Sequence, residues 1–288
     1  MFLRSRSILF LVLLTLAVAQ AAFAQTDPTP TPTATPAPAA TPPSKKPDPT
    51  PAPAAKIDLK NLTIEQVMES TVFTYGFPGG RALLNQIRKT TLERGRATYT
   101  AADGKVETAT YQRYIIRAET LPKEKIRLDQ DFPTARYSLV FNDEKIYGIY
   151  NNTIFAPRDD AAKAFENQIT RGIEAFLRYK ENESTVELGP REKVLGVDFY
   201  VVDLTDKQGR KTRFYVSSKQ FKIMMLTYED GGVKFRRKFY DYKYAQGTLV
   251  PYRTVLWADE KIVEETNIGT VTYGQKVDEE LFKTGLNG

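Results

Sequence analysis

The chain of 288 residues contains no histidine and no cysteine. Imidazole and thiolate groups are the side chains that most readily change protonation or bind soft metals near neutral pH. Without them the chain lacks the usual residues of zinc sites, of histidine-dependent or cysteine-dependent hydrolysis and of thiol redox chemistry. Carboxylate-only enzymes such as glycosidases need neither residue. The composition nevertheless favours a binding protein over an enzyme, and we expect no cofactor and no bound metal.

The first 24 residues have the pattern of an export signal. Arg4 and Arg6 give a positive start, residues 8–19 are an apolar run, and Ala22-Phe23-Ala24 fits a small-x-small cleavage site. The apolar run is too short for the ~20 residues that span a bilayer, which argues against a retained anchor. With no cysteine after the run, a bacterial lipoprotein anchor has no acceptor. The sequence predicts cleavage after Ala24 and a soluble periplasmic product.

Residues 25–55 are rich in Pro, Thr and Ala and hold eleven of the seventeen prolines. Such a tract cannot bury enough apolar surface to fold, and repeated proline favours extended polyproline II. We therefore predict a disordered linker. A stalk that gives the following domain reach, a Pro-rich ligand and a tolerated low-complexity tail are all consistent with this composition.

Residues 56–288 contain no second linker and no internal repeat, so they predict one domain. We also expect the protein to be a monomer. Arg4 and Arg6 account for two of the six net positive charges, and the charges of the linker cancel, which leaves about +4 on this domain. The excess is mild and forms no long basic run. We expect no nucleic acid as a partner.

Two helices are predicted by apolar residues at helical spacing. The first runs from Thr63 to about Tyr75, with Thr63 and Gln66 as a capping box and Leu62 placed to staple onto Val67. The segment 77–80 breaks it, and a short helical turn follows around residues 81–86. The second helix spans 159–180 with an apolar stripe that includes Phe165, Ile169 and Phe176. It is interpreted either as an ordinary core-packing helix or as a lid over a cavity.

The remaining segments predict strands. Short connections, such as the Asp103-Gly104 turn, require antiparallel neighbours because a parallel crossover needs a dozen or more residues. The sequence thus predicts an α+β fold, mainly antiparallel β, in which about eleven strands form a curved, incomplete barrel covered by helices. The predicted strands are 94–101, 105–119, 125–131, 136–142, 145–151, 193–203, 211–217, 221–229, 233–244, 248–258 and 261–273.

Large apolar side chains recur at alternate positions in several of these strands, and period-two alternation puts each set on one face. A filled core is the ordinary outcome. Two helices are few for so large a sheet, however, so we predict an apolar cavity on its concave side. The predicted cavity residues are Tyr137, Leu139, Phe141, Phe165, Ile169, Phe176, Val197, Phe199, Ile223, Met225, Phe235 and Phe239.

Polar residues give weaker evidence for a functional site than the apolar ones. Asp129 and Asp131 lie two residues apart, a spacing compatible with paired carboxylates in acid and base catalysis, but also with a solvated strand face. Ser217 and Ser218 have no histidine partner for nucleophilic catalysis. We therefore predict no catalytic residue.

The C-terminal third resembles the periplasmic outer-membrane lipoprotein carriers of the LolA type. The similarity rests on the aromatic run 239–244, on Gly247-x-x-x-Pro251, on the segment 264–271 and on the closing Asp278-x-x-x-Phe282. The resemblance implies an eleven-stranded half-barrel closed by helices, whose hydrophobic cavity shelters acyl chains in the periplasm. The Pro-rich tract departs from this family, and no single position here matches the arginine that closes its lid.

Two functions follow from these observations. The first is a periplasmic carrier that shelters the acyl chains of lipoproteins or other lipid-like amphiphiles and meets inner-membrane or outer-membrane envelope proteins. The second is an envelope sensor or scaffold that binds protein segments in the same cleft without transport. A carboxylate-dependent hydrolase is the remaining alternative.

Overall fold

A computed structural model describes residues 61–283. The predicted export signal (1–24), its cleavage site and the predicted linker (25–55) lie outside the described residues. Everything below concerns the single compact unit that contains the described residues.

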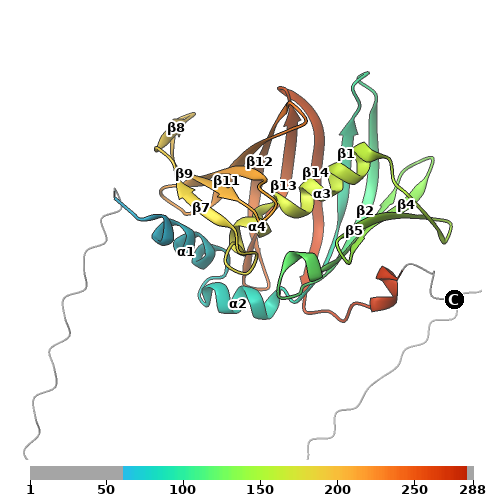
Figure 1. Cartoon of the computed structure of the whole chain (residues 1–288), viewed down its shortest axis with the longest axis horizontal. Coiled ribbons are helices and arrows are strands. Elements are labelled where there is room, and N and C mark those ends of the chain that lie inside the picture. The colour runs from blue at the N-terminus through green and yellow to red at the C-terminus, as the bar shows by residue number, and fades with distance from the viewer. Residues whose placement is uncertain (1–60, 284–288) are drawn as a thin grey trace, which may run out of the picture. The chain divides into compact units, whose positions relative to one another are not determined.

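One curved antiparallel sheet of fourteen strands dominates residues 61–283 (Figure 1). Its hydrogen-bonded order is β6-β5-β4-β3-β2-β1-β14-β13-β12-β11-β10-β9-β7, with β8 paired to β9, and the sheet does not close into a barrel. The prediction of a mainly antiparallel, incomplete barrel is confirmed. The strands are β1 Thr90–Thr100, β2 Val106–Ile116, β3 Lys125–Asp131, β4 Arg136–Asn142, β5 Lys145–Tyr150, β6 Thr153–Phe155, β7 Thr185–Leu188, β8 Glu192–Val194, β9 Val197–Thr205, β10 Lys211–Ser217, β11 Ile223–Asp230, β12 Val233–Ala245, β13 Thr248–Ala258 and β14 Lys261–Tyr273.

The count of about eleven strands was too low by three, for two local reasons. The strands β6 and β7 have only three and four residues, too few for alternation to show in the sequence. The predicted strand 193–203 is in fact two, because Leu195 and Gly196 both have positive φ and form the turn between β8 and β9. Glycine at the second turn position allows this reversal with little strain.

The first and last strands in chain order, β1 and β14, pair at the centre of the sheet. β1 runs antiparallel to β14 from Thr91↔Tyr273 to Tyr99↔Glu264, with a register shift between Arg94 and Gly95. A Cβ on Gly95 would come within 2.3 Å of the Asn267 carbonyl oxygen, so this close approach requires glycine. Strands from both halves of the chain therefore meet in one continuous surface.

The helix α1 (Ile64–Tyr75) begins as predicted. Thr63 Oγ1 accepts from the Gln66 amide at 3.3 Å, Gln66 Oε1 accepts from the Thr63 amide at 2.8 Å, and Leu62 packs in the same core cluster as Val67. The short helix α2 (Gly80–Ile87) follows after the predicted break.

The prediction of one continuous helix over 159–180 is wrong. The segment is broken at Arg171 and Gly172 into two helices, α3 (Asp159–Thr170) and α4 (Ile173–Leu177). Gly172 has extended backbone angles and caps α4. The Arg171 side chain turns inward to the Lys211 carbonyl oxygen at 2.7 Å and lies over the Tyr228 ring at 4.7 Å. The apolar stripe hid this break, because it continues across it.

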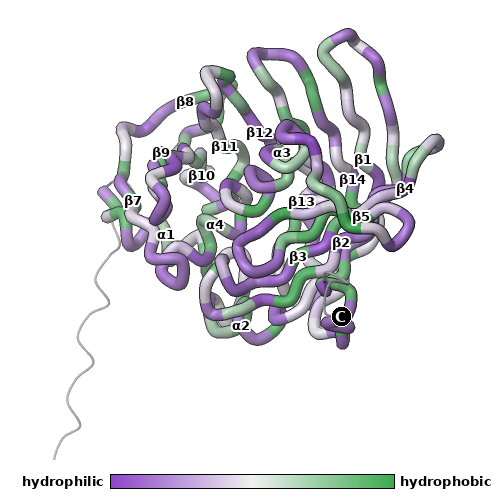
Figure 2. Tube along the Cα trace, turned by 45° about the vertical axis from the view of Figure 1, so that its right-hand side comes forward, coloured by the Kyte–Doolittle hydropathy of each residue, from purple (hydrophilic) through white to green (hydrophobic). Residues whose placement is uncertain are grey.

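The helices and the C-terminal segment cover opposite faces of the sheet. α3 packs Phe165 onto Leu128 and Leu139 on the concave side, while α1 and α4 cover the strands from β9 to β12. Hydrophobic and hydrophilic residues are interspersed along the strands, as the trace coloured by hydropathy shows (Figure 2). On the convex side, Phe282 of the 3-10 helix η2 (Glu279–Phe282) packs against Val140 and Tyr147.

Candidate functional site

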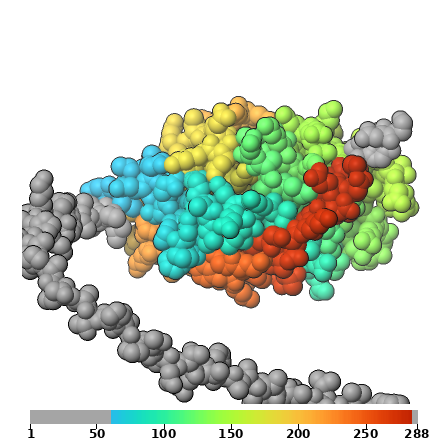
Figure 3. Space-filling view, turned by 90° about the horizontal axis from the view of Figure 1, so that it is seen from below, coloured from blue at the N-terminus to red at the C-terminus, as the bar shows by residue number. Residues whose placement is uncertain are grey.

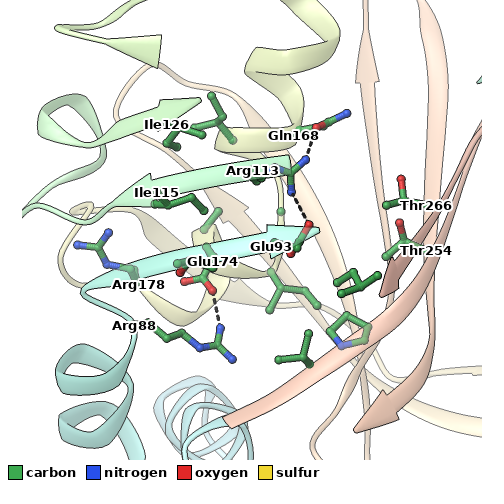
Figure 4. Close-up of a pocket in the computed structure, with 18 of the residues that line it drawn as sticks. Arg88, Glu93, Arg113, Ile115, Ile126, Gln168, Glu174, Arg178, Thr254 and Thr266 are labelled. Carbon is green, nitrogen blue, oxygen red and sulfur yellow. Dashed lines mark hydrogen bonds and ion pairs between the residues drawn. The ribbon is translucent and has the colours of Figure 1, made fainter. Parts of the chain in front are cut away.

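A cavity of about 190 Å³ lies between the concave face of the sheet and the helices α3 and α4 (Figure 4). Its walls combine apolar side chains with charged ones. The apolar side chains include Ile115, Ile126, Phe165, Ile169, Ile173, Phe239, Leu249, Val250 and Ile268. We call this space the inner cavity. Its position matches the predicted concave side, but its lining is more polar than the sequence predicted.

A chain of polar contacts crosses the sheet side of the inner cavity. Arg113 of β2 reaches Glu93 of β1 at 3.5 Å and Gln168 of α3 at 2.8 Å, as Figure 4 shows. Gln168 in turn donates to Glu264 of β14 at 3.0 Å, and Glu264 pairs with Arg237 of β12 at 3.5 Å. Burial lowers the pKa of Arg113, but Glu93 and other neighbours outweigh burial and keep this pKa above its usual value. These contacts tie α3 to the centre of the sheet.

A second cavity of about 520 Å³ lies between α2, the end of β2 and α4. Figure 3 shows the face of the domain where α2, in teal, lies beside the yellow segment around α4. We call this space the outer cavity. Its lining is basic, with Arg81, Arg88, Lys89, Arg117 and Arg178 set against three glutamates.

Four residues line both cavities: Arg88, Arg117, Glu174 and Arg178. They are joined by ion pairs. Glu174 pairs with Arg88 at 2.5 Å and with Arg117 at 3.0 Å, and the fully buried Glu124 pairs with Arg117 at 2.9 Å and with Arg178. We call these five residues the charged partition, because they separate the inner cavity from the outer one.

The charged partition holds three guanidinium groups and two carboxylates. Burial lowers the pKa of Arg178 to about 10, and repulsion from Arg117 acts in the same direction. For Glu174, burial raises the pKa, but attraction to Arg117 and Arg88 outweighs it, so the pKa lies below its usual value. The partition is thus a cluster of cations that two carboxylates do not fully neutralise.

Nine of the twelve predicted cavity residues lie on the concave side or on the helices that cover it. Phe165, Ile169 and Phe239 line the inner cavity. The other six pack in the core around it: Tyr137, Leu139 and Phe141 beneath α3, Phe176 and Ile223 near α1 and α4, and Phe235 stacked on Tyr228.

Val197, Phe199 and Met225 do not join them. Phe199 and Met225 pack in a separate cluster with Val201 and Tyr215, and Val197 is exposed. Both faces of β9 are apolar, so alternation could not tell which one faces the helices; it is the face of Tyr200, Val202 and Leu204. Met225 changes face relative to Ile223 because the pairing of β10 with β11 shifts register between Tyr215 and Val216.

The charged lining is what sequence reasoning missed. One signal was present: Arg113 stands at period two between Tyr111 and Ile115, so a charge interrupts an apolar, inward face. Glu124 and Glu174 gave no such signal, because both lie outside strands, where alternation assigns no face.

The two carboxylates considered for catalysis, Asp129 and Asp131, do not line the inner cavity. Asp129 accepts from Arg127 at 2.6 Å and from Ser138 at 2.6 Å, on the convex face, and Asp131 is exposed. Among residues 61–283, no group of three or more acidic side chains is placed to hold a metal ion.

Comparisons with known proteins decide the name of the fold. No protein-family model and no curated protein matches the chain. Solved structures do. A LolA superfamily protein from Nitrosomonas europaea gives a TM-score of 0.55 at 12% identity, over 77% of this chain and 98% of that one.

The fold is LolA-like. A domain described as a putative outer membrane lipoprotein-sorting protein from Vibrio parahaemolyticus gives a TM-score of 0.50 at 13% identity, over 77% of this chain and 97% of that one. A DUF1329 family protein from Desulfovibrio piger gives 0.51 at 15% identity, over 76% and 97%. At such identities the LolA-like similarity concerns architecture. No helix within residues 61–283 is long and apolar enough to cross a membrane.

Proposed function

We propose that this protein is a non-catalytic periplasmic carrier that shelters the acyl chain of a lipoprotein or another lipid-like amphiphile. The observation that carries the proposal is the inner cavity, which lies between a LolA-like sheet and the helices α3 and α4. Export by the signal in residues 1–24 and action as a monomer are parts of the same proposal.

The apolar wall supplies the driving force. Each methylene that moves from water to an apolar site gains about 0.8 kcal/mol. The Ile and Phe side chains of the inner cavity come from strands on one side and from α3 and α4 on the other, so a chain between them would be covered on both sides.

The volume sets a condition on binding. At about 190 Å³ the inner cavity is smaller than the ~300–1,000 Å³ of typical ligand sites. A long acyl chain must therefore displace α3 and α4 outward or extend into the outer cavity of about 520 Å³. The break at Arg171 and Gly172 provides a place at which α3 can move relative to α4.

The test is native mass spectrometry and lipid extraction of the full chain purified from expressing cells, followed by titration with a fluorescent acyl probe. We expect a bound lipid, or probe uptake at one site per chain. Ile169→Trp fills the inner cavity and should reduce uptake at least about tenfold, whereas Ile262→Trp, on the exposed end of β14, should not. A protein that is consistently empty and takes up no probe would overturn the proposal.

A further inference from the structure

The charged partition does not fit a site for a purely apolar guest. It places Arg88, Arg117 and Arg178 where the inner cavity meets the outer one, with only Glu124 and Glu174 to balance them. Burying an unbalanced charge is expensive unless a counter-charge and hydrogen bonds compensate it. Each arginine has a carboxylate partner, but three cations share two carboxylates, so the cluster carries a net charge of +1.

Two donor atoms of the partition are also unused. The Nε atoms of Arg88 and Arg117 are buried and have no hydrogen-bond partner among the residues that the structure describes. Arg88 is only 7% exposed, and its other nitrogens are held by Glu174 and by the Leu249 carbonyl oxygen at 3.0 Å. Buried donors of this kind are rare because each lost hydrogen bond destabilises the fold. They are suited to an acceptor that arrives with a ligand.

The apolar wall begins next to these donors. Ile173 directly precedes Glu174 in the chain, Ile115 lies two residues before Arg117, and both isoleucines line the inner cavity. On the other side, the exposed Lys89 lines the outer cavity together with Arg81, which pairs with Glu69 and Glu181. The cations of the partition and the methyl groups beside them form two adjoining environments of opposite polarity.

We propose that the guest is an anionic amphiphile, whose carboxylate or phosphate head binds Arg88 and Arg117 at the charged partition and whose chain lies in the inner cavity. The proposal rests on the carrier function proposed above and narrows its cargo to one head-group chemistry. An anionic head brings the missing negative charge and the acceptor oxygens, and guanidinium groups bind both carboxylate and phosphate well.

The first experiment needs no variant. Palmitate, hexadecyl phosphate, hexadecanol and hexadecyltrimethylammonium share one chain and differ in the head; each competes with a fluorescent fatty-acid probe for the full chain below its micelle concentration. We expect palmitate and hexadecyl phosphate to bind at least about tenfold more tightly than hexadecanol, and the cation to bind most weakly. The ratio of palmitate to hexadecyl phosphate then identifies the preferred anion.

The second experiment assigns the head to the partition. Arg117→Gln should reduce the preference for palmitate over hexadecanol about tenfold and leave the affinity for hexadecanol nearly unchanged. The control, Arg213→Gln, removes an arginine that pairs with Asp203 on the outer face of the sheet and should change neither affinity. Thermal unfolding confirms that each variant is folded; if Arg117→Gln is not, Arg117→Lys takes its place, with a weaker loss of preference expected.

The outcomes separate the two proposals. Equal affinity for all four heads would overturn the anionic preference and leave the carrier function standing. A preference that Arg117→Gln or Arg117→Lys does not reduce would overturn the assignment to the partition. Failure of every amphiphile to displace the probe, or of the probe to bind, would overturn the carrier function itself.

Discussion

Glu124 is the charged residue most deeply buried among those that the structure describes, with none of its surface exposed. It faces Arg117 and Arg178, so Glu124→Gln leaves two buried guanidiniums with less negative charge. Breaking a buried pair in this way costs about 3–5 kcal/mol. Urea unfolding should show this loss, whereas Glu119→Gln, whose side chain is 86% exposed, should change stability by less than ~0.5 kcal/mol. Equal effects would mean that water already screens the partition.

Glu174 should make the stability of the domain depend on pH in the acid range. Burial raises its pKa, but Arg117 and Arg88 lower it more, so the folded pKa lies below that of the unfolded chain. A carboxylate with a lowered folded pKa contributes stability that is complete above the unfolded value of ~4.3 and is lost as pH falls through the folded value. Urea midpoints measured across this range should fall less steeply for Glu174→Gln than for the natural chain. Parallel curves would contradict this contribution.

At the scale of elements, Arg171 holds the end of α3 against the sheet. Its guanidinium donates hydrogen bonds to Asn167 Oδ1 at 2.8 Å and to the Lys211 carbonyl oxygen at 2.7 Å. The Asn167 amide group in turn donates to Asp230 of β11 at 2.8 Å. Arg171→Met keeps the length of the side chain and removes these bonds. Hydrogen exchange at the amides of α3 should then accelerate about tenfold or more, with little change in the central strands.

The matched control is Arg158→Met. This arginine precedes α3, and its side chain is 85% exposed and hydrogen-bonds only Asp160 among the described residues. We expect less than a twofold change in exchange along α3. If Arg158→Met and Arg171→Met accelerate exchange equally, Arg171 does not act as the fastening point of the helix.

What the sequence could predict depended on whether the signal was local. The capping box of α1 and the strands β3, β4 and β10 follow from caps, turns and alternation within a few residues, and the structure confirms them. The break between α3 and α4 depends instead on a contact of Arg171 with β10, which no neighbour in the chain reveals. The face of Phe199 likewise depends on which side of β9 the helices cover.

At the scale of the whole molecule, the site forms only when the two ends of the domain pair. Glu93 lies in β1 and Glu264 in β14, and both line the inner cavity because these strands are neighbours at the centre of the sheet. Period-two alternation assigns each residue to a face but gives no order of strands. Of the residues predicted for the cavity, Phe165, Ile169 and Phe239 line it, whereas its charged residues required the sheet order.

The C-terminal motif Asp278-x-x-x-Phe282 closes the convex face of the same sheet. Asp278 accepts from the Glu280 amide at 3.0 Å and so starts η2, which places Phe282, 1% exposed, against Val140 and Tyr147. Phe282→Ala leaves a cavity there and should lower the free energy of unfolding by about 3–5 kcal/mol. Phe77→Ala, at a side chain that is 54% exposed, is the control and should cost less than ~1 kcal/mol.

Trp257 fluorescence measures whether Phe282→Ala destabilises the whole sheet. Trp257 is the single tryptophan, and it lies on β13, several strands away from β4 and β5. If the fourteen strands unfold as one cooperative unit, Phe282→Ala shifts the urea midpoint of Trp257 fluorescence as much as that of far-ultraviolet circular dichroism. We expect equal shifts, because β1 and β14 join both halves through continuous backbone pairing. An unchanged Trp257 midpoint would show instead that the β1–β6 half unfolds separately, and the inner cavity would then lose one wall before the other.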